Sequence, residues 1–238
     1  MMQPMTRSTT VLMLAALLAS CAGGSDEDGA EPDAADTAAR SGAAAAEPGA
    51  DGRPASDDPA VAAWLARVDS ALFTSWGACP FECCVYRDWV AEARVVVRAE
   101  PSTSSAVVAT LEEGERFQAD TGFVRVTSPQ LVIVTAPIEA YFEPVGPGGG
   151  RTDTLAIGDT LLVMHPVGEG HWLLTDGRRR FTTEQFWPSG DYTPYSGVRG
   201  RPLGEHAAEW WARVRTGEGV EGWIDAYASE LGNVDACG

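Results

Sequence analysis

The feature that most constrains the fold is a cluster of cysteines. Three of the five cysteines, Cys79, Cys83 and Cys84, fall within six positions, and the other two are Cys21 and Cys237. In an oxidising compartment such cysteines are expected to form disulfides, whereas in a reducing one the same residues favour metal binding or redox chemistry. The destination of the chain therefore decides what these residues do.

The N-terminal residues predict export. Arg7 precedes an apolar run at 11–18, small residues follow, and the run is too short to span a bilayer. The sequence LASC at 18–21 resembles the bacterial lipobox. This resemblance implies that residues 1–21 are a lipoprotein signal peptide and that Cys21 is lipidated and becomes the first residue of the mature protein. A plain secretory signal is the alternative.

The residue after Cys21 bears on localisation. Ala22 stands where an inner-membrane retention signal has aspartate. We therefore expect a cell-envelope protein held by its lipid anchor, at the periplasmic face of the outer membrane if the host has two membranes. Each buried acyl methylene adds about 0.8 kcal/mol to membrane affinity, so several acyl chains bind strongly.

Residues 22–58 are predicted to be a disordered acidic tether. They contain no aromatic and no large aliphatic residue, so they cannot bury enough apolar surface to offset the entropy of ordering. Ten acidic residues and two arginines give this segment a net charge of −8, and the self-repulsion extends it. A flexible tether of this kind would hold the folded part away from the membrane.

The charge of the folded part limits its partners. The whole chain carries a formal net charge of −17, and its folded part is acidic as well. This balance argues against nucleic acid and against anionic lipid as primary partners.

An exported chain predicts disulfides among the four cysteines that remain once Cys21 is lipidated. Neighbours such as Cys83 and Cys84 pair only under strain, because disulfide geometry requires more widely separated Cα atoms. We therefore expect one of them to pair with Cys79 and the other with Cys237, with both alternatives open. Zinc and redox readings are weaker, because no set of four ligands at workable spacing and no C-x-x-C motif is present.

The segment 59–89 is predicted to hold one helix followed by the cysteine-rich stretch. Asp58 stands at the N-cap position and Pro59 in the first turn of a helix expected within 56–73. Apolar residues recur at helical spacing, so we expect one amphipathic helix docked on the core.

From residue 90 the pattern changes to short β-branched runs separated by turns. Runs such as VVVR, FVRV and LVIV alternate with Pro, Gly and Ser-rich turns at intervals of 8–12 residues. This spacing predicts a mainly β fold built of small barrels or a sandwich, without room for βαβ units.

Two segments resemble halves of the bacterial SH3-like (SH3b) domain. The stretch VVVRAEPSTSSAVVATLEEGE, 95–115, is similar to the opening of that domain, and EWWARVRTGEGVEGWIDAYASEL, 209–231, to its second half. The matching residues are Arg98, Pro101, Ser102, Ser105, Leu111, Gly114 and Glu115 in the first, and Trp211, Val214, Gly219, Gly222 and Trp223 in the second. Ala99-Glu100 departs from the usual Ser/Ala-Gly.

The resemblance implies SH3-like β-barrels, in one of two arrangements. Two barrels at 90–145 and 152–232, divided at 144–151, are favoured, because 155–181 has its own turns and strands. The alternative is one elaborated unit with a long insertion between the two half-motifs. Residues 59–89 precede either arrangement.

Aromatic residues predict a ligand groove. Within an SH3-like scaffold a long aromatic loop accepts peptide or sugar at low entropic cost. The predicted ligand-binding residues are Phe186, Trp187, Tyr192, Tyr195, Trp211 and Trp223. The alternative is that these rings fill the end of a small barrel.

No catalytic, metal or cofactor site is predicted. The three histidines lack metal spacing, no nucleophile motif accompanies them, and the basic GRRR at 177–180 is read as a hairpin tip rather than an anion site. We expect a membrane-anchored binding module for cell-wall peptide or glycan or an envelope protein. The alternative is a structural or assembly protein with no small ligand. A cell-wall hydrolase is the weakest hypothesis.

Overall fold

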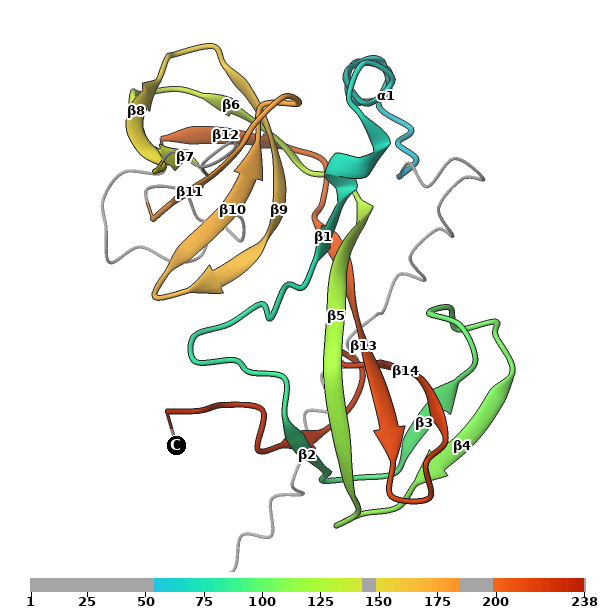
Figure 1. Ribbon diagram of the computed structural model, residues 1–238. Helices are drawn as coiled ribbons and strands as arrows, with labels where there is room; N and C mark the ends of the chain where they lie inside the picture. The colour runs from blue at the N-terminus through green and yellow to red at the C-terminus, as the bar shows by residue number, and fades with distance from the viewer. Residues whose placement is uncertain (1–53, 143–148, 185–198, 238) are drawn as a thin grey trace, which may run out of the picture. The chain divides into compact units, whose positions relative to one another are not determined.

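The computed structural model describes residues 54–142, 149–184 and 199–237. The predicted signal peptide with Cys21, nearly all of the tether, and four of the predicted ligand residues lie outside these ranges. Within them the chain is mainly β, in two curled antiparallel sheets, so the mainly β prediction is confirmed (Figure 1). No helix in these ranges is long and apolar enough to cross a membrane.

The first sheet, here sheet A, has eight strands. Its order is β15-β2-β5-β13-β14-β3-β4, and β1 also pairs with β5. The strands are β1 (Thr74–Trp76), β2 (Asp88–Ala91), β3 (Val95–Arg98), β4 (Val107–Leu111), β5 (Arg116–Ser128), β13 (Ala207–Thr216), β14 (Glu221–Asp225) and β15 (Leu231–Gly232).

The second sheet, here sheet B, has seven strands in the order β12-β6-β9-β10-β11-β7-β8. It is built entirely from the sequence between β5 and β13. Its strands are β6 (Leu131–Val134), β7 (Ile138–Phe142), β8 (Arg151–Leu155), β9 (Thr160–Gly168), β10 (His171–Thr175), β11 (Arg180–Thr183) and β12 (Gly200–Leu203).

Strand pairing brings the two half-motifs together in sheet A. β13 pairs with β5, and β14 pairs with β3, where Trp223 stands opposite Arg98. A Cβ on Gly222 would lie 2.6 Å from the Arg98 carbonyl oxygen, so only glycine allows this approach. Gly219 has a positive φ of 85°, which glycine adopts without strain.

The strand pairing does not follow the boundary expected at 144–151. This boundary falls between β7 and β8, which pair with each other from Ile138 opposite Leu155 to Phe142 opposite Arg151. β5 and β13, which lie before and after sheet B in the sequence, also pair with each other, and the division into one or two units stays a prediction. Strands are brought together by matching their apolar faces, and a local sequence pattern does not say which distant strand supplies the match.

The two faces of sheet A differ in character. Val124 on β5 faces the core with Trp210 and Ala212 of β13 and Ile224 of β14, all buried in one apolar cluster. Because side chains alternate along a strand, Phe123 and Trp211 point to the opposite face. Trp211 is covered, since its side chain is fully buried.

Before sheet A the chain forms a short helix, α1 (Pro59–Leu65), and a 3₁₀ turn, η1 (Ser70–Phe73). Asp58 caps α1 by accepting from the backbone N–H of Ala60 at 2.8 Å. Asp69 then caps η1 by accepting from Ala71 N–H at 3.0 Å. α1 ends at Leu65, with Ala66 at its C-cap, so it covers only part of the range 56–73 in which a helix was expected. Apolar residues of this segment pack with β5, β9 and β10 in a further core cluster.

The four cysteines lie at disulfide distance in two pairs. Cys79 pairs with Cys84 and Cys83 with Cys237, with Cα–Cα separations of 5.4 and 5.6 Å. This is one of the two connectivities that the sequence left open. The Cys83–Cys237 pair links residues 154 positions apart, so it holds the C-terminus against the segment that precedes β2.

The two disulfides should differ in their contribution to stability. In the chain-entropy model a loop of about 155 residues contributes about 5 kcal/mol and a loop of about six residues about 2 kcal/mol. Replacing both Cys83 and Cys237 by serine should therefore lower the free energy of unfolding by about 3 kcal/mol more than replacing both Cys79 and Cys84. Urea denaturation of the two double variants measures this difference, and equal losses would contradict the assignment of the long loop.

Candidate binding surface

The face of sheet A opposite its core carries a row of aromatic rings. Trp76 of β1 stands opposite Phe123 of β5 in the strand register. Trp223 of β14 joins the row through ring contact with Phe123. We call these three residues the aromatic face. Side chains alternate between the two faces of each strand, as in GFVRV, so the residues that point away from the core lie together on this face.

Within the aromatic face, Phe123 contacts the rings of both Trp76 and Trp223. The ring centroids of Trp76 and Phe123 are 4.7 Å apart, and those of Phe123 and Trp223 are 5.6 Å apart, both in tilted arrangements. Such spacings are typical of favourable aromatic pairs. Trp76 is 70% exposed while Phe123 beneath it is 2% exposed, so a large aromatic surface is presented to solvent on a fixed support.

A charged pair borders the aromatic face. Arg125 of β5 and Glu209 of β13 are opposite each other in the register and form a partly buried ion pair. The Arg125 guanidinium also lies over the Phe123 ring, 5.6 Å from its centroid. A second contact of Arg125, to the Pro101 carbonyl at 3.5 Å, brings the turn between β3 and β4 beside this border. The face therefore offers both flat rings and hydrogen-bonding groups.

Asp225 adds a second carboxyl to this side of the sheet. It stands opposite Trp211 in the β13–β14 register. Burial raises the pKa of Asp225, and the Glu209 carboxylate raises it further, while the Ala228 N–H bond and the Arg98 charge act in the other direction. The two carboxyls are thus close enough to influence each other beside the aromatic row.

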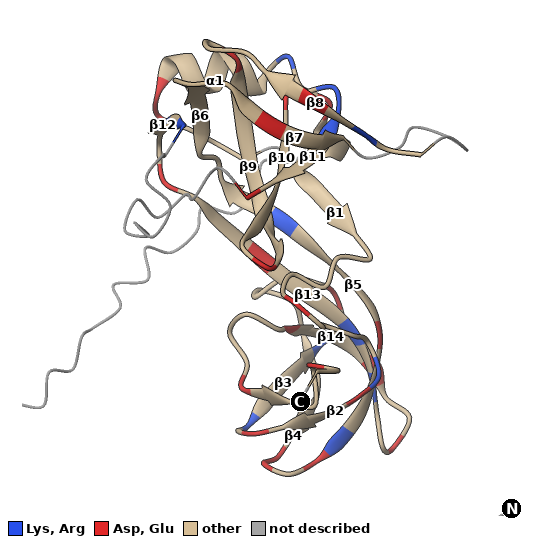
Figure 2. Ribbon diagram, turned by 90° about the vertical axis from the view of Figure 1, so that its left-hand side faces the viewer, with Lys and Arg blue, Asp and Glu red and all other residues tan. Residues whose placement is uncertain are grey.

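The charges of the described strands are otherwise interspersed. Arginines and acidic residues alternate along the ribbons of both sheets (Figure 2). On β13 and β14, for example, Arg213 and Arg215 both pair with the exposed Glu221. The aromatic face is therefore distinguished by the exposed Trp76 ring and the rings that support it rather than by a field of one sign.

The predicted ligand residues differ in whether the structure describes them and in how far they are buried. Phe186, Trp187, Tyr192 and Tyr195 lie outside the described residues, and their role stays a prediction. Trp223 is half-buried within the aromatic face, and Trp211 is fully buried behind it. Buried as it is, Trp211 supports its neighbours rather than presenting a surface of its own.

Sequence reasoning missed two residues of the aromatic face. Trp76 lies in a three-residue strand just ahead of the cysteine cluster, too short to show alternation. Phe123 showed a usable signal, because in GFVRV the residues at 123 and 125 alternate with valines. This alternation indicates that Phe123 points away from the core, but only the strand pairing shows that Trp76 lies on Phe123.

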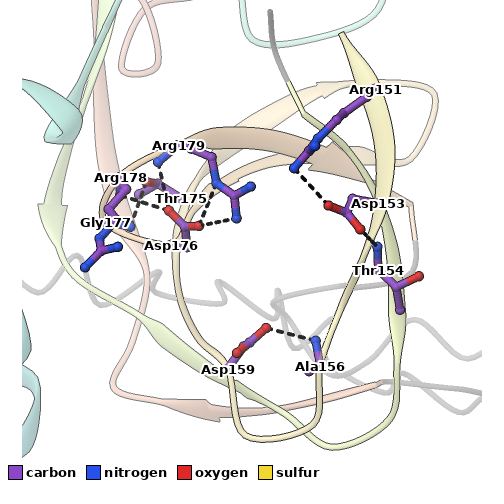
Figure 3. A network of polar contacts seen from close by, with 10 residues as sticks. All are labelled: Arg151, Asp153, Thr154, Ala156, Asp159, Thr175, Asp176, Gly177, Arg178 and Arg179. Carbon is purple, nitrogen blue, oxygen red and sulfur yellow. Dashed lines mark hydrogen bonds and ion pairs between the residues drawn. The ribbon is translucent and has the colours of Figure 1, made fainter. Parts of the chain in front are cut away.

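The GRRR stretch at the β10–β11 turn is largely occupied by contacts within the chain. Asp176 accepts from the backbone N–H groups of Arg178 and Arg179 and from the Arg179 guanidinium (Figure 3). Arg179 also lies over the Phe142 ring, 4.3 Å from its centroid. The hydrogen bonds from both arginines, together with the Arg179 charge, outweigh burial and lower the pKa of Asp176. These contacts favour the hairpin-tip reading over an anion site.

Two histidines are enclosed where β9 meets the connection between β12 and β13. His165 of β9 has Nδ1 2.8 Å from the Pro166 carbonyl, and His206 has Nε2 2.8 Å from the Met164 carbonyl. The His206 ring packs edge-on against Trp172 and is partly buried. Burial lowers the pKa of both rings, and that of His165 falls to about 4.

One group of potential metal ligands occurs among the described residues. Ligand atoms of Glu82, Cys83 and Cys237 lie within 4.8 Å of one another. Both sulfurs belong to the Cys83–Cys237 pair, and a disulfide sulfur does not act as a thiolate ligand. This group is therefore explained by the disulfide.

Comparisons with known proteins return no match. A scan of family models, a search of curated proteins and a search of solved structures each find none. The candidate surface consequently rests on the geometry of this chain.

The buried His165 predicts a loss of stability in acid. Its pKa is 6.5 when unfolded and about 4 when folded, so the folded state binds fewer protons. Stability should therefore be complete above pH 6.5 and fall as the pH drops towards 4, by about 3 kcal/mol in total from this residue.

Urea denaturation between pH 7 and pH 4 measures this dependence. The His165→Gln variant, which cannot take up the proton, serves as the comparison, because the carboxylates contribute equally to both chains. A pH dependence as steep in the variant as in the parent would contradict the prediction.

Proposed function

We propose that this protein is a lipid-anchored binding module of the cell envelope, with an SH3-like scaffold that presents the aromatic face to cell-wall material. The observation that carries the proposal is Trp76, largely exposed yet held on the buried Phe123 ring. Isolated exposed apolar side chains are ordinary on protein surfaces, but an aromatic row with a supporting ring and polar border is typical of a recognition surface.

The pairing of the half-motifs supports the SH3-like scaffold. Arg98 of the first half-motif and Trp223 of the second are opposite each other, and Leu111 of the first is buried opposite Val95. The residues that carry the resemblance thus lie together in one curled sheet. Fold resemblance by itself does not establish a ligand, so the aromatic face is the part of the argument that concerns function.

The chemistry of the face fits cell-wall peptide or glycan. Flat indole rings accept the apolar faces of sugars and of extended peptides, and the Arg125–Glu209 pair offers hydrogen bonds at the border. An envelope protein is the other partner class that the sequence analysis named. A structural protein without a small ligand is the alternative function.

The anchor is tested through Cys21. The lipobox at 18–21 predicts incorporation of a labelled fatty acid when the chain is made in a bacterium that processes lipoproteins. Labelling should disappear in the Cys21→Ser variant, while Cys79, Cys83, Cys84 and Cys237 stay in place as internal controls. Label that persists without Cys21 would contradict lipidation at this residue.

Binding is tested by co-sedimentation with isolated cell-wall sacculi. The Cys21→Ser chain should sediment with sacculi, and Trp76→Ala in that background should weaken the affinity at least tenfold, as expected for a tryptophan hot spot. Tyr141→Ala is the matched control, because Tyr141 is an exposed aromatic on β7 of sheet B. Equal binding by all three chains would place the contact elsewhere, and no binding by any would favour a protein partner or the structural alternative.

A further inference from the structure

Arg180 links sheet B to the strand that carries Trp76. Its Nη2 atom donates to the Thr74 carbonyl at 2.6 Å and to the Ala71 carbonyl at 3.3 Å. Thr74 is the first residue of β1, and Trp76 is the last. One guanidinium from β11 therefore holds the start of the strand whose end supplies the exposed ring of the aromatic face.

β1 is held by few other contacts. It pairs with β5 through three residues, from Thr74 opposite Arg125 to Trp76 opposite Phe123. After it, Gly77 N–H donates to the Gly122 carbonyl at 2.7 Å. Such a short edge strand depends strongly on each contact that positions it. Loss of the Arg180 contact should therefore change the position of Trp76 at the end of the strand.

His165 and Arg180 flank β10 on one face of sheet B, because His165 is opposite Leu173 and Arg180 is opposite Thr175, two residues further along β10. A carbonyl can only accept a hydrogen bond, so the contact with Pro166 places the proton of the neutral ring on Nδ1. Its Nε2 atom is buried without a hydrogen-bond partner in the described ranges. A proton from solvent would therefore be taken up at Nε2, on the face of the sheet that also carries the charged Arg180 guanidinium.

Among the described residues, no carboxylate is found to act on His165. The groups that act on it are Arg180 from β11 and His206 from the connection before β13, and both lower its pKa in addition to the effect of burial. From η1 and β1 the groups presented to Arg180 are backbone carbonyls. The backbone of Glu82 lies near Gly168 at the end of β9, but its carboxylate is not among the groups that shift His165.

We propose that His165 is a proton-sensitive switch for the aromatic face. Protonation at Nε2 repels the Arg180 guanidinium, weakens its hold on the Thr74 and Ala71 carbonyls, and releases β1 together with Trp76 from Phe123. The consequence for ligand binding rests on the proposed function, since it takes the aromatic face as the binding surface. The movement of β1 itself does not depend on what the face binds.

The switch is tested by nuclear magnetic resonance on the Cys21→Ser chain between pH 7 and pH 3.5. The ring signals of His165 should titrate near pH 4, and the amide signals of residues 74–76 and the Trp76 indole signal should change with the same midpoint. In His165→Gln these β1 signals should no longer follow that midpoint, whereas in His206→Gln they should. The comparison of His165 with β1 in the parent needs no variant, so it holds even if a variant fails to fold.

Two results would overturn the switch. One is that β1 signals stay unchanged while His165 takes up its proton. The other is that they titrate identically when His165 is glutamine.

Binding to sacculi separates the switch from the proposed function. If protonation fully releases β1, the apparent affinity falls about twofold at pH 4 and more steeply below, because only the unprotonated fraction is competent. His165→Gln should lose this fall. A chain that binds no sacculi but shows the coupled titration keeps the switch and loses the ligand. A chain that binds without the coupled titration keeps the ligand and loses the switch.

Discussion

The antiparallel pairing of β5 with β13 is the interaction on which the rest of the structure depends. These strands run side by side from Ala207 opposite Ser128 to Thr216 opposite Phe117 (Figure 1). The pairing returns the chain to sheet A after the whole of sheet B has been formed. It also sets which residues point to the core and which to the outer face, because a slip of one residue would exchange the two sets.

The register has opposite consequences on the two faces. On the core side it places Trp210 next to Val124, and Trp210 donates from its indole N–H to the Tyr86 hydroxyl at 2.9 Å. On the outer side it places Glu209 opposite Arg125, beside the Phe123 ring that supports Trp76. The same hydrogen-bonded ladder therefore stabilises the barrel-like core and arranges the proposed recognition surface.

Much of this organisation was predictable from local patterns. Alternation in FVRV and EWWARV indicates strands with two unlike faces, and the cysteine spacing limited the disulfides to two connectivities. The two half-motifs indicated that 95–115 resembles the opening of an SH3-like domain and 209–231 its second half. These predictions depend on short-range chemistry, which the sequence displays directly.

The remaining features depend on long-range contacts. The burial of His165 follows from its place in the apolar run of β9, but it shares a face with Arg180 only because β9 and β11 both pair with β10. Likewise Trp76 belongs to a strand of three residues, and its role became visible through its partner Phe123. The pairing of β7 with β8, on either side of the glycine-rich stretch at 144–151, is likewise a contact that the local sequence does not display.

The most direct test of the account is to map where solubilised cell-wall fragments contact the chain, using the indole N–H resonances. The account predicts that the signals of Trp76 and Trp223 shift on addition of the fragments, while those of Trp89 and Trp210, which lie in the sheet A core, stay in place. Shifts confined to sheet B residues such as Trp172, or no shift at all, would contradict the assignment of the aromatic face as the binding surface.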